Sequence, residues 1–143
     1  KSDPTKFMDV VEELEDYADI VLLDAPAGMG LSARPVLGSG NVMPIVNPEI
    51  TSISGALKTK LATKELGSNI VGMTLNRVTR DLGEIGLTEI QKALDAKIIG
   101  TIPEDVEVRR SNSSGKPLIL SKPESPAAVA ITDLAKAVAS LLR

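Results

Sequence analysis

The chain has 143 residues, with 16 lysines and arginines against 19 aspartates and glutamates, so its formal net charge is −3. It contains no cysteine and no histidine, which excludes disulfides, thiolate nucleophiles, sulfur-ligated metals and the commonest general base. A bound metal is therefore expected to be a hard cation held by oxygen, such as magnesium. The acidic balance gives the chain as a whole no electrostatic reason to bind nucleic acid or anionic lipid.

The first half of the chain alternates between helical and strand patterns. Asp3-Pro4 is typical of a helix start, and the apolar residues that follow recur at helical spacing as far as Tyr17 or Ala18. Strands are predicted over 20–24 and 42–46, because both runs are apolar on both faces. A second helix is predicted from Asn47-Pro48-Glu49 to Leu66-Gly67. The expected inward residues of the two helices are Phe7, Val10, Val11, Leu14, Ile50, Ile53, Leu57 and Leu61.

The second half repeats the alternation. Strands are predicted over 70–75 and 98–102, a short helix over 86–94, and a last helix from Ser125-Pro126 onward, while 111–122 reads as a loop. Strand and helix in regular alternation predict one α/β domain over 1–143, doubly wound, with a mainly parallel sheet and helices on both faces.

In sheets of this kind ligands bind at the carboxyl ends of the strands, so function is expected just past each strand. Four segments qualify: 24–30, 47–49, 76–77 and 103–105. Asp24 is a candidate to hold a metal-bound water, and Gly28 allows a backbone N–H to approach a terminal phosphate. The structural alternative is that Asp24 only caps the turn before Pro26.

Two further groups are candidates for binding a nucleotide. The Asn76 amide is both donor and acceptor, which suits the edge of a purine, and the Arg77 guanidinium is able to stack or pair beside it. Pro103 supplies a rigid turn, and Glu104 and Asp105 start a helix whose free N–H groups suit a base or ribose. The alternatives are a strand-ending turn for the first pair, and helix-start charges with an Asp105–Arg109 pair for the second.

Four motifs together resemble the carboxyl-terminal part of the MinD/ParA family of deviant P-loop ATPases, with the septum-site MinD group nearest. They are DIVLLDAPAG (19–28), IVNPEITS (45–52), TLNRV (74–78) and GTIPEDVEVRRSNSSGKPLI (100–119). The last is the most specific, and the resemblance spans nearly the whole chain from about Tyr17.

The resemblance implies an ATP-driven switch that positions division sites or similar cargo. It implies ATP or ADP and Mg²⁺ as ligands, a nucleotide-dependent homodimer and a regulatory protein partner. Asp24 would hold magnesium and water, and the segment to Gly28 would sense the γ-phosphate. Asn76 would read the adenine, and Pro103, Glu104 and Asp105 would line the base and ribose.

The sequence departs from the family in one major respect: it contains no G-x-x-x-x-G-K-[ST] loop, and the family's first switch is also missing. This loop supplies most of the phosphate affinity, so the chain alone is expected neither to bind ATP usefully nor to hydrolyse it. In the family the loop's strand runs between the strand that ends at Asp24 and strand 42–46. If the residues shown are the whole polypeptide, those two strands are expected to pair with each other or with another chain. The alternative is that the missing half is present in the protein and is only absent from the sequence given.

Other functions remain open beside this one. A ParA-like protein would hold DNA without sequence preference through Arg109, Arg110, Lys116 and Lys122, although the overall acidity disfavours DNA. A non-catalytic α/β interaction module is the alternative from another class. The last helix has Lys136 as its only cation, which leaves membrane attachment unsupported, and with no transmembrane or signal pattern the expected location is the cytoplasm.

Overall fold

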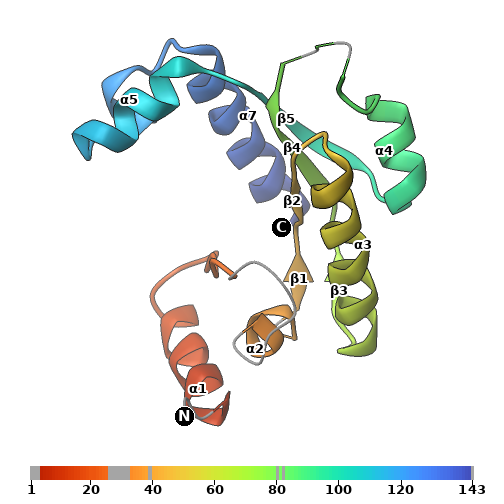
Figure 1. The fold of residues 1–143 in the computed structure, drawn as a ribbon. Helices are drawn as coiled ribbons and strands as arrows, with labels where there is room; N and C mark the ends of the chain where they lie inside the picture. Colours follow the sequence, from red (N-terminus) through yellow and green to blue (C-terminus); the bar gives the residue numbers. More distant parts are fainter. Residues whose placement is uncertain (1–3, 26–32, 39, 80, 82, 143) are drawn as a thin grey trace.

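The structure, a computed structural model, describes residues 4–25, 33–38, 40–79, 81 and 83–142 (Figure 1). From residue 33 to 103 helices alternate with strands or pairs of short strands, and three helices follow β5. The helices are α1 (Pro4–Glu15), α2 (Ala33–Leu37), α3 (Ile50–Glu65), α4 (Leu87–Leu94), α5 (Val106–Ser114), α6 (Leu118–Ser121) and α7 (Pro126–Leu141). The strands are β1 (Asn41–Val42), β2 (Ile45–Val46), β3 (Asn69–Ile70), β4 (Met73–Val78) and β5 (Ile98–Pro103).

All strand pairs among the described residues are parallel: β1 pairs with β3, and β2, β4 and β5 form a sheet in the order β2-β4-β5. Asn41 is opposite Asn69 and Ile45 is opposite Thr74, so the register gains one residue between the two pairs. Pro44 explains the interruption. Its carbonyl accepts the Thr74 N–H at 2.9 Å, but it has no N–H to donate to the same neighbour.

The main core lies between β4 and the helices α3 and α4. Met73 and Leu75 of β4 are fully buried, as are Val46 of β2 and Ile90 of α4. A second cluster joins α6 and α7 to β5, with Ala127 and Ala128 fully buried at the start of α7. In Figure 1, α3 and α4 cover one side of β4 and β5, and α7 covers the other. The predicted α/β fold, a parallel sheet with helices on both faces, is confirmed.

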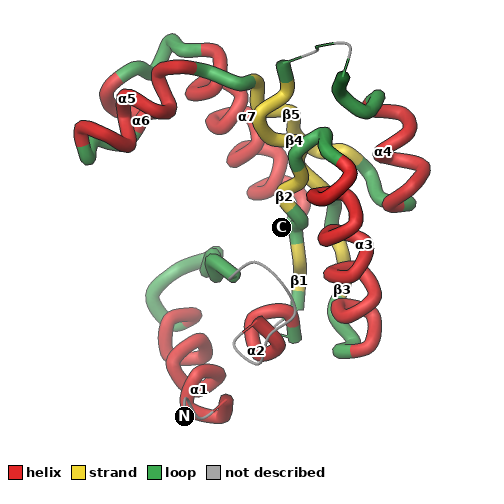
Figure 2. Tube along the Cα trace, in the orientation of Figure 1, coloured by secondary structure: helices red, strands yellow, loops and turns green. Residues whose placement is uncertain are grey.

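The strand predicted over 20–24 is not formed. Residues 16–25 follow α1 as turns and loop (Figure 2), and Leu22 is 80% exposed. A strand requires a neighbour for its backbone N–H and C=O groups, and the described residues offer none to this segment. The two strands that were expected to pair, 20–24 and 42–46, do not pair with each other.

The loop predicted over 111–122 is wrong, because α5 extends to Ser114 and α6 fills 118–121. The serines do not interrupt α5, since their hydroxyls bond back to helix carbonyls; the Ser113 hydroxyl donates to the Arg109 carbonyl at 3.0 Å. Gly115 then ends the helix at φ 65°, a left-handed conformation that glycine adopts without strain.

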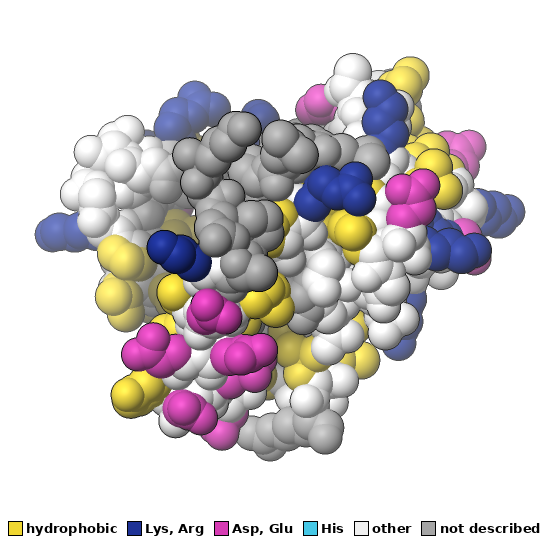
Figure 3. All heavy atoms as spheres, turned by 90° about the horizontal axis from the view of Figure 1, so that it is seen from below, with side chains coloured by type: hydrophobic (Ala, Val, Ile, Leu, Met, Phe, Trp, Pro, Cys, Tyr) yellow, Lys and Arg dark blue, Asp and Glu magenta, His cyan; other side chains and the backbone are white. Residues whose placement is uncertain are grey.

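The predicted helix boundaries agree with the structure better than the predicted inward-facing residues do. α3 begins at Ile50 rather than at Pro48 and ends beside Gly67 at φ 76°. Several residues expected to face inward are exposed instead: Val10, Leu14, Ile50, Leu57 and Leu61. Acidic side chains gather around α1 and the turn after it, as the lower face in Figure 3 shows, and include Asp9, Glu12, Glu13, Glu15 and Asp16. Among the described residues, no helix is long and apolar enough to cross a membrane.

Candidate functional site

The carboxyl ends of β4 and β5 lie together at the top of the sheet in Figure 1, next to the start of α3. We call this edge, formed by residues 76–78 and 103–105, the rim. Arg77 of β4 and Glu104, just after β5, form an ion pair across the rim, with Arg77 Nε 2.8 Å from Glu104 Oε2. The hydrogen bond to Glu104 and the charge of that carboxylate raise the pKa of Arg77, and Glu49 at the start of α3 adds to the effect. The rim therefore joins three segments that are far apart in the sequence.

A β-bulge shapes β4 at Asn76 and Arg77. Leu75 is opposite Thr101 and Val78 is opposite Pro103, so β4 carries one residue more than β5 between these pairs. Arg77 adopts φ 59°, which is uncommon for a residue with a side chain. Bulges of this kind redirect side chains beside binding sites, and this one leaves Asn76 half-buried and Arg77 exposed at the rim. Asn76 thus lies inside a strand that runs on to Val78, three residues beyond the predicted end.

The Pro103–Asp105 segment is held by the backbone. Pro103 is the last residue of β5, and the Glu104 N–H donates to the Val78 carbonyl at 3.1 Å. The Asp105 carboxylate accepts from the Glu107 N–H at 2.9 Å and from the Ala127 N–H at 3.1 Å. These two hydrogen bonds lower the pKa of Asp105.

Asp105 therefore caps the start of α5 and ties it to the start of α7. The Asp105–Arg109 pair of the alternative interpretation does not form, and an ion pair on α5 joins Glu107 to Arg110. Sequence reasoning placed Asp105 at the start of a helix but predicted neither its cap nor its contact with Ala127, which lies 22 positions away and leaves no local signal.

Asp24 does not join this rim in the structure. It is exposed at the end of the segment that leaves α1, and in Figure 1 this segment lies with α1 and α2, away from the top of β4 and β5. Gly28 lies outside the described residues. The described part of the chain brings no three acidic side chains together in a way that would hold a metal ion. The metal role of Asp24 and the phosphate role of Gly28 stay predictions.

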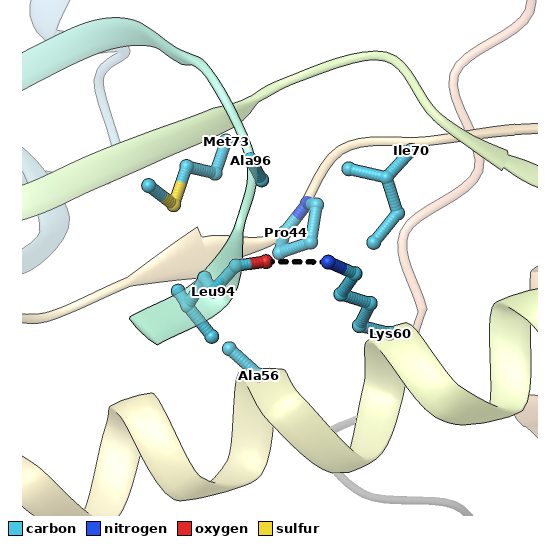
Figure 4. Close-up of a pocket in the computed structure, with 7 residues that line it drawn as sticks. All are labelled: Pro44, Ala56, Lys60, Ile70, Met73, Leu94 and Ala96. Atoms are coloured by element: carbon cyan, nitrogen blue, oxygen red, sulfur yellow. Dashed lines mark hydrogen bonds between the residues drawn. The ribbon is translucent and has the colours of Figure 1, made fainter. Parts of the chain in front are cut away.

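The small cavity in Figure 4 has a structural role that the sequence did not indicate. It is lined by apolar side chains of both layers, including Met73 and Leu94, and Lys60 of α3 closes one side. Lys60 Nζ donates to the Leu94 carbonyl at 2.8 Å and reaches the Asp95 carboxylate at 3.1 Å. A cation at these carbonyls stabilises the carboxyl end of α4 and fixes α4 against α3.

The chemistry available at the rim is recognition of a flat, polar group. Asn76 offers an amide donor and acceptor, and Arg77 offers a planar cation held on one side by Glu104. Pro103 gives the rim a rigid edge. An amide beside a guanidinium matches a purine base better than it matches a phosphate, which requires several N–H groups pointing to one point.

Comparison with known proteins gives consistent relatives, although no protein-family model matches the chain. It is 39% identical over 136 residues to an uncharacterized ATP-binding protein of Methanocaldococcus jannaschii, covering 94% of this chain and 52% of that protein. It is 32% identical over 126 residues to the chloroplastic septum site-determining protein minD homolog of Arabidopsis thaliana, covering 85% of this chain and 39% of that one. The chain thus spans about half the length of the curated relatives or less.

Comparison with solved structures finds the same group of proteins. The cell division ATPase MinD of Pyrococcus furiosus superimposes with a TM-score of 0.89 at 32% identity, over 97% of this chain and 59% of its own. The septum site-determining protein MinD of Pyrococcus horikoshii, complexed with Mg-ADP, gives a TM-score of 0.88 at 34% identity, over 97% and 58%.

Proposed function

The chain belongs to the MinD/ParA family of ATP-binding proteins and matches a carboxyl-terminal portion of them, and from this we propose that its sheet rim is the base-binding side of an ATP-dependent switch. The observation that carries the proposal is the bulge at Asn76 and Arg77 beside Glu104. It presents an amide and a guanidinium at the carboxyl edge of a parallel sheet, where ligands of such folds bind.

Each rim residue has a separate part in this proposal. Asn76 hydrogen-bonds the purine edge, and Arg77 lies against the base, with its direction set by the 2.8 Å contact to Glu104. Pro103 and Glu104 border the base and ribose. Asp105 acts mainly through its backbone position, because its carboxylate already accepts two N–H groups.

Magnesium and the phosphates are proposed to bind at Asp24 and Gly28 in the complete protein. Magnesium is usually bound by one or two carboxylates together with phosphate oxygens and water, so a single exposed aspartate fits that donor set only when the phosphates are held nearby. The bound ion would neutralise phosphate charge. This chain supplies one candidate ligand and one glycine, and its sequence has no G-x-x-x-x-G-K-[ST] loop to hold the phosphates.

The chain alone is therefore proposed to be inactive. We place its activity in a complete cytoplasmic protein that hydrolyses ATP, dimerises with nucleotide bound and positions a cargo such as the division site. A solved MinC:MinD cell division protein complex of Aquifex aeolicus, whose MinD is 25% identical to this chain, supports a regulatory protein as the partner.

Fluorescent ATP binding tests the proposal directly. Titrations with and without Mg²⁺ are made on this chain and on a longer protein that carries the same residues behind a glycine–lysine loop. We expect magnesium-dependent binding only by the longer protein, weakened by Asn76→Ala. Exposed Asn112→Ala on α5 serves as the matched control, because it changes the same side chain away from the rim. Equal binding by the Asn76→Ala variant would disprove the assignment of the rim.

A further inference from the structure

The outward side of α5 borders an open hollow in the surface. The hollow is lined by five residues, all of them in this helix: Val106, Arg109, Arg110, Ser113 and Ser114. Their separation by three or four positions places them on one side of α5.

The opposite side of α5 faces the protein. Val108 packs against the buried cluster that joins α6 and α7 to β5, and Ser111 is buried. Val106, by contrast, is 56% exposed, and both arginines beside it are exposed as well. The outward side of α5 is therefore a helix face that the described chain leaves uncovered.

Positive charge dominates this face. Arg110 forms an ion pair with Glu107, whose side chain is only 20% exposed, while Arg109 has no ion-pair partner among the described residues. Arginine beside an apolar side chain is typical of protein interfaces. The net charge of −3 disfavours nucleic acid as the occupant, so the face suits a partner helix that carries acidic residues next to an apolar one.

The helix α1 has these properties itself. Asp9, Glu12 and Glu13 are exposed on α1, and Asp16 is exposed in the turn after it. Their spacing places the four carboxylates on one side. Val10 beside them is 54% exposed. Within the part of the chain that the structure describes, no cation forms an ion pair with any of the four.

We propose that copies of this chain associate head to tail, with the acidic side of α1 of one copy lying along the outward side of α5 of the next. Within one copy, α1 and α5 are at opposite ends of the molecule, as Figure 1 shows, so a chain cannot make this contact with itself. A second copy supplies the matching helix, because the two faces carry opposite charge.

The two helix faces match in spacing as well as in charge. The arginines of α5 follow Val106 by three and four positions, and the first carboxylates of α1 follow Asp9 by the same two steps. Two carboxylates are therefore able to lie opposite Arg109 and Arg110. Val10 then lies near Val106, and two half-exposed apolar side chains are removed from water.

The contact joins two different surfaces, so a pair of copies does not complete it. Each pair still has one free α1 face and one free α5 face, and further copies add until a ring closes or an open filament forms. The contact uses no residue of the rim, so its test is independent of the proposed function.

Sedimentation equilibrium of the 143-residue chain tests the proposal. We expect the average mass to rise with chain concentration up to about 1 mM, where weak contacts become populated. Salt should oppose this rise, because the screening length falls from about 30 Å at about 0.01 M salt to about 3 Å at about 1 M salt. At the higher salt concentration the chain is expected to be a monomer.

Two neutralised variants separate the two surfaces. Glu12→Gln with Glu13→Gln removes charge from α1, and Arg109→Gln with Arg110→Gln removes it from α5. Each variant alone should associate about tenfold more weakly than the natural chain, because two close charge pairs are lost. An equimolar mixture should form a one-to-one complex and nothing larger, since each pair then has one natural face of each kind.

Lys58→Gln with Lys92→Gln is the matched control. Both lysines are exposed on other helices, and this variant has the same net charge as the α5 variant, so it should associate like the natural chain. Arg109→Gln alone leaves the pair between Arg110 and Glu107 in place and should weaken association by about threefold. It keeps the test decisive if circular dichroism shows that the double α5 variant does not fold.

Four results would overturn the proposal. Two concern the natural chain: a monomer at low salt, or self-association that high salt does not weaken. The other two concern the variants: neutralised chains that associate as strongly as the natural one, or a mixture of folded variants that forms no one-to-one complex.

Discussion

The close approach of α7 to β5 depends on a missing side chain at Gly100. A Cβ at this position would lie 2.8 Å from Leu134 Cδ1 of α7 and 3.4 Å from Thr74 Oγ1 of β4. The first distance is far below an ordinary carbon–carbon contact, so Gly100→Ala forces the Leu134 side chain out of its position or moves the helix. Replacing the glycine also has a benefit, because glycine in a strand lowers stability relative to alanine.

The magnitudes can be compared. Overpacking a tight contact costs about 1–3 kcal/mol, while removing a strand glycine gains about 0.5–1 kcal/mol. Gly100→Ala should therefore lower the free energy of unfolding by roughly 1 kcal/mol in the natural chain, because overpacking outweighs the glycine term. When Leu134→Ala has already removed the clashing methyl groups, the same substitution should be neutral or should raise it by up to about 1 kcal/mol. The sign of the change in unfolding free energy on Gly100→Ala therefore depends on whether the Leu134 side chain is present.

Urea unfolding followed by circular dichroism measures this as a double-mutant cycle over the natural chain, the two single variants and the double variant. Gly55→Ala, on the exposed face of α3 with nothing within 4 Å of its would-be Cβ, is the control and should stabilise in either background. If Gly100→Ala is equally destabilising with and without Leu134, α7 does not pack on β5 as described.

Further predictions concern the site and the helix caps. In the complete protein, Asp24→Ala should abolish magnesium-dependent turnover with an unchanged melting temperature, and retained turnover would contradict its metal role. Asn76→Ala should reduce the preference for ATP over GTP in competition binding; an unchanged preference would move base recognition elsewhere. The lowered pKa of Asp105 means that its caps stabilise the fold above the unfolded pKa near 3.8 and lose this effect as the pH falls through the folded value. The difference in urea midpoint between the natural chain and Asp105→Asn should therefore be smaller at pH 3 than at pH 7, and a constant difference would argue against the caps. Ser125→Ala should lower the free energy of unfolding by about 1 kcal/mol, since its hydroxyl caps α7 at the Ala128 N–H; no loss by urea unfolding would show the cap to be unimportant.

Local patterns in the sequence were sufficient for most elements. Ser125-Pro126 starts α7 as its pattern predicts, and α4 (Leu87–Leu94) lies within one residue of the helix predicted over 86–94. Uninterrupted apolar runs predicted parallel strands with both faces covered. These signals are local, because the residues that form a cap or a strand face are a few positions apart.

The predictions that failed share a physical cause. The segment 20–24 has the composition of a buried strand, but a strand forms only when another supplies its hydrogen-bonding partners, and the described chain offers none. The prediction that Leu14 and Ile50 face inward is wrong for a similar reason. Periodicity shows which face of a helix is apolar, but it does not show whether another element covers that face. The serine-rich run of α5 was misread because hydroxyls that return to helix carbonyls leave no signal in the pattern.

Short motifs were enough to predict the α/β class, the family and the presence of Asn76, Arg77 and Glu104 near strand ends. It took the packed fold to show that a bulge turns Arg77 toward Glu104 and that Asp105 joins α5 to α7. These features depend on register and on contacts between residues far apart in the chain. They are set by how the elements pack together, which no local pattern records.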